Sequence, residues 1–195
     1  MREILKQIGS SLREAGFKGS GRNFSKLQGD FVFVINMQAS RGGDGFYVNL
    51  GAQPVFVPSE SGPVTDPKML KEYQCILRKR VGARWAWRMS ATEFSEFMAK
   101  LQTEQRDFFT GASRLRTAIA SQSSETLLTD FCSGTTRARA TLHLARACAA
   151  LGHKIKALEL VKLGCELAGP RGSSLRASLK AVMESVDRGG SPTSP

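Results

Sequence analysis

The residues that first suggest chemistry lie in a glycine-rich stretch, QASRGGDGFYVNLG, at positions 38–51, where Arg41 and Asp44 stand between two apolar segments. A phosphate-binding loop would need the pattern G-x-x-x-x-G-K-[S/T] between a strand and a helix, so that backbone amides and the helix dipole face the anion. No Lys-Ser or Lys-Thr pair follows these glycines, and the next segment is typical of a strand. The stretch therefore predicts a β-hairpin turn, in which three glycines would take positive φ angles: Gly42, Gly43 and Gly45.

A second group of residues could bind an anion from the surface of a sheet. Side chains alternate between the two faces of a strand, so the strand-like segments 31–40, 46–51 and 75–81 each divide into two rows. One row is almost wholly apolar and is predicted to pack on helices. The other row is polar and cationic: Asn36, Gln38, Ser40, Tyr47, Asn49, Arg78 and Arg80.

This polar row, with Arg41 at its end, predicts a sheet face that could recognise an anionic ligand or a protein partner. The alternative is a face that is simply solvated, as is common in antiparallel sheets. Asn and Gln are poor strand formers, and their presence in strands favours the binding interpretation.

Basic residues near the end of the same region allow a different function. They are interleaved with Trp85 and Trp87, a combination that suits single-stranded nucleic acid through phosphate contacts and base stacking. The basic residues are Arg78, Lys79, Arg80, Arg84 and Arg88. On a strand, however, the two tryptophans share one face and would belong to the core, so nucleic-acid binding is kept as the alternative function.

No arrangement of residues predicts catalysis or a cofactor. The two histidines, His143 and His153, fall in C-terminal helical sequence, far from the N-terminal carboxylates in turns and loops, Asp30, Asp44, Glu60 and Asp66. We therefore expect no enzyme; an enzymatic role would need Asp30, Asp44 or Glu60 in a deep pocket beside Arg41. The cysteines are too widely spaced for a CxxC pair and predict buried free thiols rather than a metal site or a disulfide: Cys75, Cys132, Cys148 and Cys165.

The chain of 195 residues carries 28 Lys and Arg against 17 Asp and Glu, a net charge of +11. The excess is spread along the chain, which favours association with polyanions without specifying a partner. No signal-peptide core follows Met1, and no apolar window approaches the roughly 20 residues of a membrane span. We therefore expect a cytoplasmic protein that does not contact a membrane.

The elements that would position these residues follow from periodicity. An amphipathic helix is expected at 3–15, and strands at 31–38, 46–57, 73–81 and 84–89, with a bulge or sheet edge at Pro54. Asp66 is expected to cap a short helix, and Ser90 with Glu93 to form the capping box of a helix that runs to about 116. Its apolar stripe would comprise Phe94, Phe97, Met98, Leu101, Phe108 and Leu115.

The amino-acid composition changes after a serine-rich linker at 121–124. Residues 125–187 are Ala- and Leu-rich helical sequence with breaks at 133–134, at Gly152 and at 169–172. The prediction is an α+β domain at 1–120 with a small antiparallel sheet packed on helices, a helical region at 121–187 and a disordered tail at 188–195.

The N-terminal part contains a series of motifs in a fixed order: AGFK (15–18), VINMQASR (34–41), FYVNLG (46–51), CILRKRVG (75–82) and the tryptophan segment 85–87. In these motifs it resembles a mainly bacterial family, the domain of unknown function numbered 4304. The resemblance covers about residues 1–115 and implies an α+β domain with a small antiparallel sheet, and no activity. Its motifs include much of the polar row, namely Asn36, Gln38, Ser40, Arg41 and Asn49.

Residues 141–170 resemble one tetratricopeptide unit, with 173–187 as a capping helix. The matching positions are Leu144, Ala145, Gly152, Ala157 and Pro170, whereas Thr141 and Gly164 depart from the pattern. A single unit cannot bury its own apolar face, so it should pack on the helix at 125–132 and on the N-terminal domain. The alternative is a generic helical hairpin.

These features predict a non-enzymatic binding protein. Its partner would be a protein or an anionic ligand, held by the polar sheet face or by the groove of the helical hairpin. By analogy with other small bacterial α+β domains, neutralisation of a toxin is one setting for such a protein.

Overall fold

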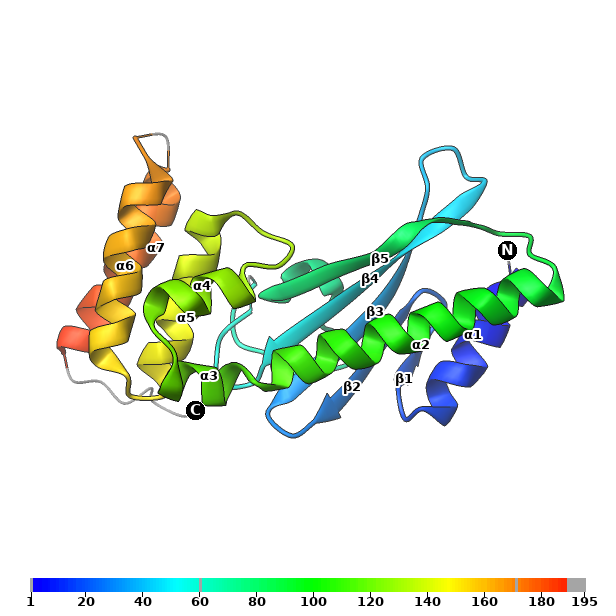
Figure 1. Ribbon diagram of the computed structural model, residues 1–195, viewed down its shortest axis with the longest axis horizontal. Coiled ribbons are helices and arrows are strands. Elements are labelled where there is room, and N and C mark those ends of the chain that lie inside the picture. The colour runs from blue at the N-terminus through cyan, green and yellow to red at the C-terminus, as the bar shows by residue number, and fades with distance from the viewer. Residues whose placement is uncertain (1, 60, 171, 189–195) are drawn as a thin grey trace. The chain divides into compact units, whose positions relative to one another are not determined.

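The computed structural model describes residues 2–59, 61–170 and 172–188 (Figure 1). The chain divides into two compact units between Ser113 and Arg114. The predicted α+β class is confirmed, because the first unit holds an antiparallel sheet with helices and the second is helical. Apart from Arg188, the tail predicted at 188–195 lies outside the described residues.

Five strands form one antiparallel sheet in the order β1-β2-β3-β4-β5. They are β1 (Lys18–Ser20), β2 (Asn23–Gln28), β3 (Phe31–Ala39), β4 (Gly45–Pro54) and β5 (Leu77–Ala86). β1 and β2 were not predicted, because their polar residues and glycines mask the strand pattern. β5 is a single strand, so the prediction of two strands at 73–81 and 84–89 was wrong, and its predicted start lies before Leu77. The pairing of β4 with β5 is irregular between Phe46 and Val48, where Gly82 has a φ of +59°.

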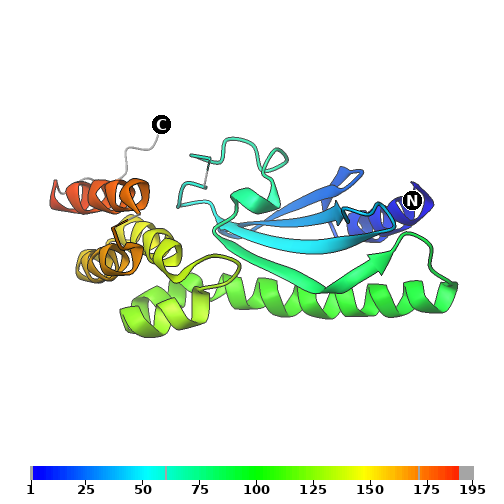
Figure 2. The same cartoon turned by 90° about the horizontal axis from the view of Figure 1, so that it is seen from above.

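One face of the sheet packs on helices, as the apolar rows predict. α1 (Arg2–Glu14) places Gly9 against Phe24 of β2, and α2 (Ala91–Ser113) lies along the same side of the sheet (Figure 2). Aromatic rings pack between α2 and the sheet: Phe46 stacks on Trp87 with ring centroids 4.4 Å apart, and Phe97 contacts Phe46 edge-on.

The capping box of α2 is confirmed, since the backbone N–H of Ser90 donates to Glu93 Oε2 at 2.7 Å and the Glu93 N–H donates to Ser90 Oγ at 3.3 Å. The predicted apolar stripe is partly wrong. Phe109, rather than Phe108, is buried, and Leu115 belongs to α3 because α2 ends at Ser113.

Part of the other face of the sheet is covered by the connection between β4 and β5, residues 55–76. Val32 and Val34 of β3 pack against Leu70 and Cys75 of this connection. The connection contains a short 3-10 helix, η1 (Glu72–Gln74). The helix expected after Asp66 is absent from the described residues: Asp66 Oδ1 accepts from the Lys68 N–H at 2.9 Å, but the segment forms a turn.

Two local predictions for β4 can be compared with the structure. Pro54 is the last residue of β4 and pairs with Phe31 of β3, but the pairing with β5 ends at Ala52, so β4 is an edge at Pro54, as one of the two predicted alternatives has it. The predicted hairpin turn between β3 and β4 is confirmed, but of its three glycines Gly43 alone has a positive φ. The prediction of a positive φ was wrong for Gly42 and Gly45. A glycine at position 45 is favoured for another reason: the Trp85 carbonyl oxygen lies 2.3 Å from where a Cβ would be.

The described residues of the second unit form five helices, and the breaks between them fall where the sequence places them. They are α3 (Leu115–Ser121), α4 (Ser124–Phe131), α5 (Arg137–Ala150), α6 (Lys154–Ala168) and α7 (Ser173–Asp187). α5 packs against α4, α6 and α7, and Ser124 Oγ of α4 donates to Glu159 Oε2 of α6 at 2.6 Å. The predicted packing of the hairpin on the helix at 125–132 is thus confirmed.

Candidate functional site

The strand register brings four polar side chains into one line across the sheet. Asn23 of β2 pairs with Asn36 of β3, Asn36 pairs with Asn49 of β4, and Asn49 pairs with Arg80 of β5. Partners in an antiparallel ladder share a face, so all four side chains lie on the side away from α1 and α2. We call these four residues the amide row. Sequence reasoning missed Asn23 because it missed β2.

Hydrogen bonds link the amide row into a chain that ends on a guanidinium group. Asn36 Nδ2 donates to Asn23 Oδ1 at 2.8 Å, and Asn49 Nδ2 donates to Asn36 Oδ1 at 3.4 Å and to Gln38 Oε1 at 3.1 Å. Arg80 then donates twice, from Nε to Asn49 Oδ1 at 3.0 Å and from Nη2 to Gln38 Oε1 at 3.1 Å. These bonds orient the amides and fix the plane of the guanidinium.

Arg80 is held without being neutralised. Its guanidinium carbon lies 4.5 Å from the centre of the Tyr47 ring, a cation–π contact that steadies the side chain from a third direction. Asn49 beneath it is only 5% exposed, whereas Arg80 itself is exposed. Across the described ranges no carboxylate contacts Arg80, because its partners are neutral amides and an aromatic ring.

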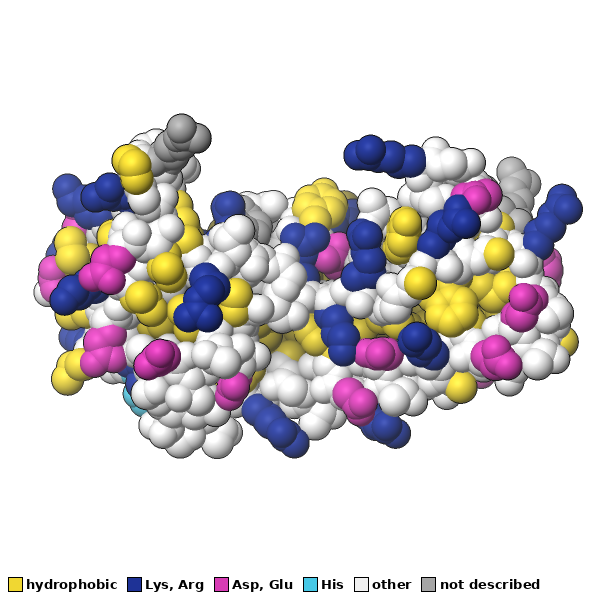
Figure 3. All heavy atoms as spheres, turned by 45° about the horizontal axis from the view of Figure 1, so that its top comes forward, with side chains coloured by type: hydrophobic (Ala, Val, Ile, Leu, Met, Phe, Trp, Pro, Cys, Tyr) yellow, Lys and Arg dark blue, Asp and Glu magenta, His cyan; other side chains and the backbone are white. Residues whose placement is uncertain are grey.

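The neighbouring cations of β5, unlike Arg80, form ion pairs with carboxylates of this chain. Arg78 Nε contacts Glu72 Oε1 of η1 at 2.6 Å, and Lys79 Nζ contacts Glu104 Oε2 of α2 at 2.7 Å. Lys79 therefore points to the helix-covered face. Figure 3 shows basic side chains, with acidic ones among them, over the surface formed by β5 and the β3–β4 turn.

The β3–β4 turn has a carboxylate of its own. Asp44 accepts a hydrogen bond from Ser40 Oγ at 2.9 Å and forms an ion pair with Arg84. The Ser40 bond first, and then Arg84, hold the pKa of Asp44 below its usual value. Asp44 is thus ionised at neutral pH and ties the turn to β5, while Arg41 is exposed beside it.

The structure therefore brings some of the predicted site residues into contact and places the others apart. Asn36, Gln38, Tyr47, Asn49 and Arg80 form one connected group. Arg78 lies on the same face but contacts Glu72, and Ser40 and Arg41 belong to the turn. We call the connected group, together with Asn23, the Arg80 site.

The other candidates are placed as follows. Trp87 is buried against Phe46, so its ring is not open to a base. Trp85 is half-buried, edge-on to Phe97 at 4.9 Å and with Lys100 Nζ 5.9 Å from its ring centre, so the prediction of a core position was wrong for Trp85. Asp30 is exposed, and Glu60 lies outside the described residues. Within the described ranges, no cluster of His, Cys, Asp and Glu could hold a metal ion. Each helix in these ranges is too short or too polar to span a bilayer.

The four cysteines are free thiols, but only two are buried. Burial raises the pKa of Cys148 to about 11, and it raises the pKa of Cys75 further. Cys132 and Cys165 are half-buried, so the prediction of burial was wrong for them.

Because the thiolate is the reactive form, we expect an alkylating reagent at pH 8 to modify Cys132 and Cys165 well before Cys75 and Cys148. Mass spectrometry of peptides over a time course measures the order; early modification of Cys75 would contradict it.

Residues 8–107, just over half of the chain, match the family model described as Domain of unknown function (DUF4304). The match includes the whole Arg80 site. No curated protein and no solved structure matches the chain.

Proposed function

Because the chain belongs to the family DUF4304, whose description names no activity, we propose a function from the site itself: a non-enzymatic binding protein that holds a carboxylate of a protein partner at Arg80. A single observation carries the proposal. Arg80 is an exposed cation that amides and an aromatic ring orient, and no acid of the described chain neutralises it.

The geometry suits a carboxylate. A guanidinium has five N–H donors, and only two bonds from Arg80 go to Asn49 and Gln38. The remaining donors can meet a carboxylate in the two-bond arrangement that Arg and carboxylates favour. Since the side chain is already fixed, binding loses less side-chain entropy than it would with a free arginine.

The surroundings favour a protein partner over a free anion. Tyr and Arg are the residues that most often dominate protein interfaces, and Tyr47 packs directly against Arg80. On the connection that covers part of this face, Met69 and Tyr73 are 68% and 64% exposed. Large exposed side chains on the same side of the sheet as an oriented cation are typical of an interaction surface.

We expect Arg80→Glu to weaken binding of the partner by about 30-fold or more, because reversing one charge of a close pair costs roughly 2 kcal/mol or more. The partner would be recovered from native lysate with the tagged full chain, and its affinity measured by calorimetry for wild type, Arg80→Glu and Arg80→Ala. Arg176→Glu, an exposed arginine of α7, is the matched control and should bind as wild type does. Equal affinities for Arg80→Glu and wild type would refute the role of Arg80.

Nucleic-acid binding is the second candidate, favoured by the net charge of +11 and by Arg88, an exposed arginine for which the described chain offers no acid partner. Arg78, Lys79 and Arg84 contribute less here, since Glu72, Glu104 and Asp44 neutralise them. Gel shifts with single- and double-stranded oligonucleotides at low salt separate the candidates. A shift that weakens steeply with salt and is lost in Arg80→Glu/Arg88→Glu would favour nucleic acid.

We also retain as a proposal that α5 and α6 form a tetratricopeptide-like hairpin whose groove offers a second contact for a partner. Supporting it, Gly152 joins two helices of similar length, and α7 packs on both of them. A cytoplasmic location and a bacterial source stay predictions.

A further inference from the structure

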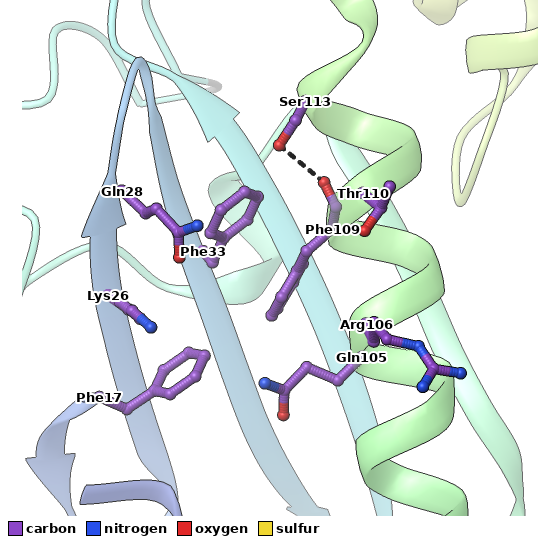
Figure 4. A pocket seen from close by; sticks show the side chains of 9 residues that line it. All are labelled: Phe17, Lys26, Gln28, Phe33, Gln105, Arg106, Phe109, Thr110 and Ser113. Carbon is purple, nitrogen blue, oxygen red and sulfur yellow. Dashed lines mark hydrogen bonds between the residues drawn. The ribbon is translucent and has the colours of Figure 1, made fainter. Parts of the chain in front are cut away.

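A cavity of about 270 Å³ lies on the helix-covered face of the sheet, opposite the Arg80 site (Figure 4). It opens between β2, β3 and α2, entirely within the first unit. Lys26 and Gln28 of β2 line one wall, Phe33 of β3 lies at its base, and Gln105 and Phe109 come from α2. It is therefore independent of the function proposed above.

The base of the cavity is aromatic. The ring of Phe109 lies between two others: its centroid is 4.3 Å from that of Phe33, with the rings stacked, and 6.2 Å from that of Phe17. Figure 4 shows Phe109 reaching from α2 towards the strands, between Phe17 and Phe33. Because Phe109 is 8% exposed and Phe17 and Phe33 are each 3% exposed, a flat ligand ring would meet these rings edge-on, one of the arrangements that aromatic pairs prefer.

The walls are polar and carry positive charge. Lys26 Nζ donates to the Ala15 carbonyl oxygen at 2.9 Å and lies 5.8 Å from the centre of the Phe17 ring. An ammonium group has three donors, so donors remain for a ligand. None of the residues that line the cavity is acidic, so the electrostatic environment favours an anion.

Two amides at the cavity have no partner of their own. The side chains of Gln28 and Gln105 make no hydrogen bond within the described part of the chain. Figure 4 shows the Gln105 amide turned towards Phe17 and the Gln28 amide turned towards Phe33, both over the aromatic base. Each offers an N–H donor to a bound oxygen without breaking an existing bond.

We propose that this cavity binds a small aromatic carboxylate, with its ring against Phe109 and its carboxylate between Lys26 and the amide of Gln105. The size follows from the volume. At about 270 Å³ the cavity is larger than the engineered protein cavity of about 150 Å³ that binds benzene, which leaves room for a ring with a short acidic side chain.

The experiment titrates the full ¹⁵N-labelled chain with three probes and follows amide shifts by NMR. The probes are 3-phenylpropionate, its uncharged amide 3-phenylpropionamide, and acetate. The acid should bind about tenfold more tightly than the amide, because a charged hydrogen bond to Lys26 adds roughly the equivalent of one decade. Acetate, which lacks the ring, should not bind, and the shifts should centre on residues 26, 28, 105 and 109.

Two variants test the assignment. Lys26→Met keeps the length of the side chain without its charge and should bring the affinity for the acid down to that for the amide. Gln105→Glu, on the surface of α2, keeps the size and should repel the acid while leaving the amide bound; it also serves if Lys26→Met fails to fold. Arg176→Gln is the control. Equal affinity for acid and amide, absence of binding by all three probes, or shifts centred elsewhere would overturn the proposal.

Discussion

Replacing Gln53 with alanine is expected to lower the free energy of unfolding by about 3–5 kcal/mol, one of the largest effects of any single substitution in the first unit. The Gln53 side chain is 0% exposed and joins both ends of the connection 55–76 to β4. Its Nε2 donates to the Val57 carbonyl oxygen at 2.7 Å, and its Oε1 accepts from the Ile76 N–H at 3.2 Å. Alanine leaves both backbone groups without a partner in a dry site and opens a cavity.

Chemical denaturation measures the loss, with Gln102→Ala on the exposed surface of α2 as the matched control, expected within about 0.5 kcal/mol of wild type. Hydrogen exchange should show faster exchange across 55–76 in Gln53→Ala, because the bonds that hold its two ends are gone. A loss below about 1 kcal/mol would mean that the connection is held mainly by its apolar contacts with Val32 and Val34.

Gln53→Glu adds a pH dependence to the same prediction. A buried carboxylate facing the Val57 and Pro54 carbonyl oxygens is disfavoured, so the folded-state pKa of the new glutamate is raised above its unfolded value. Protonated, it can still donate to one carbonyl and accept from Ile76. The variant should therefore be most stable below the unfolded pKa of about 4.3 and should lose stability as pH rises through the raised folded pKa, relative to wild type at each pH.

The Gln53 contacts bear on the Arg80 site because the connection carries Glu72. While η1 packs on the sheet, Glu72 forms an ion pair with Arg78. Of the two arginines, Arg80 is then the one available to the carboxylate of a partner protein. A loosened connection would release Arg78 as a second cation on the same face. The fold thus sets how many charges this face presents.

Much of this face could be predicted from alternation alone. β3 and β4 are long and regular, and a period of two residues places Asn36 with Gln38 and Tyr47 with Asn49. Because the apolar rows of both strands must face the core, the two polar pairs fall on one face of the sheet. The antiparallel pairing then brings them side by side with Arg80. These residues needed no knowledge of distant contacts.

What the sequence did not predict depends on partners far along the chain. Glu104 lies 25 positions from Lys79 and Asp44 lies 40 from Arg84, and neither pairing leaves a local pattern. The cover over Val32 and Val34 comes from an irregular connection, which has no periodicity to read. β2 was missed because Asn23, Ser25 and Lys26 are poor strand formers, and only pairing with β3 makes them a strand.

In the second unit, Gly164→Ala is expected to lower stability by about 1–3 kcal/mol, although alanine is the better helix former. Gly164 of α6 lies between two helices: a Cβ there would be 2.2 Å from Thr141 Oγ1 of α5 and 2.9 Å from Leu179 Cδ1 of α7. Both neighbours are 0% exposed, and Thr141 Oγ1 is also bonded to the Ala138 carbonyl oxygen at 2.7 Å. Thr141 and Gly164, the two departures from the tetratricopeptide pattern, therefore compensate each other.

Gly111→Ala in α2 is the matched control for this prediction, since a Cβ there meets nothing within 4 Å. It should raise the free energy of unfolding by about 0.5–1 kcal/mol, so the same substitution in two helices changes sign with the space around it. Thr141→Ala removes the nearest atom, and in a double-mutant cycle by denaturation it should recover part of the loss in Gly164→Ala. If Gly164→Ala stabilises as Gly111→Ala does, then α5, α6 and α7 are packed less tightly than these distances imply, and the proposed tetratricopeptide-like hairpin loses its closest helix contact.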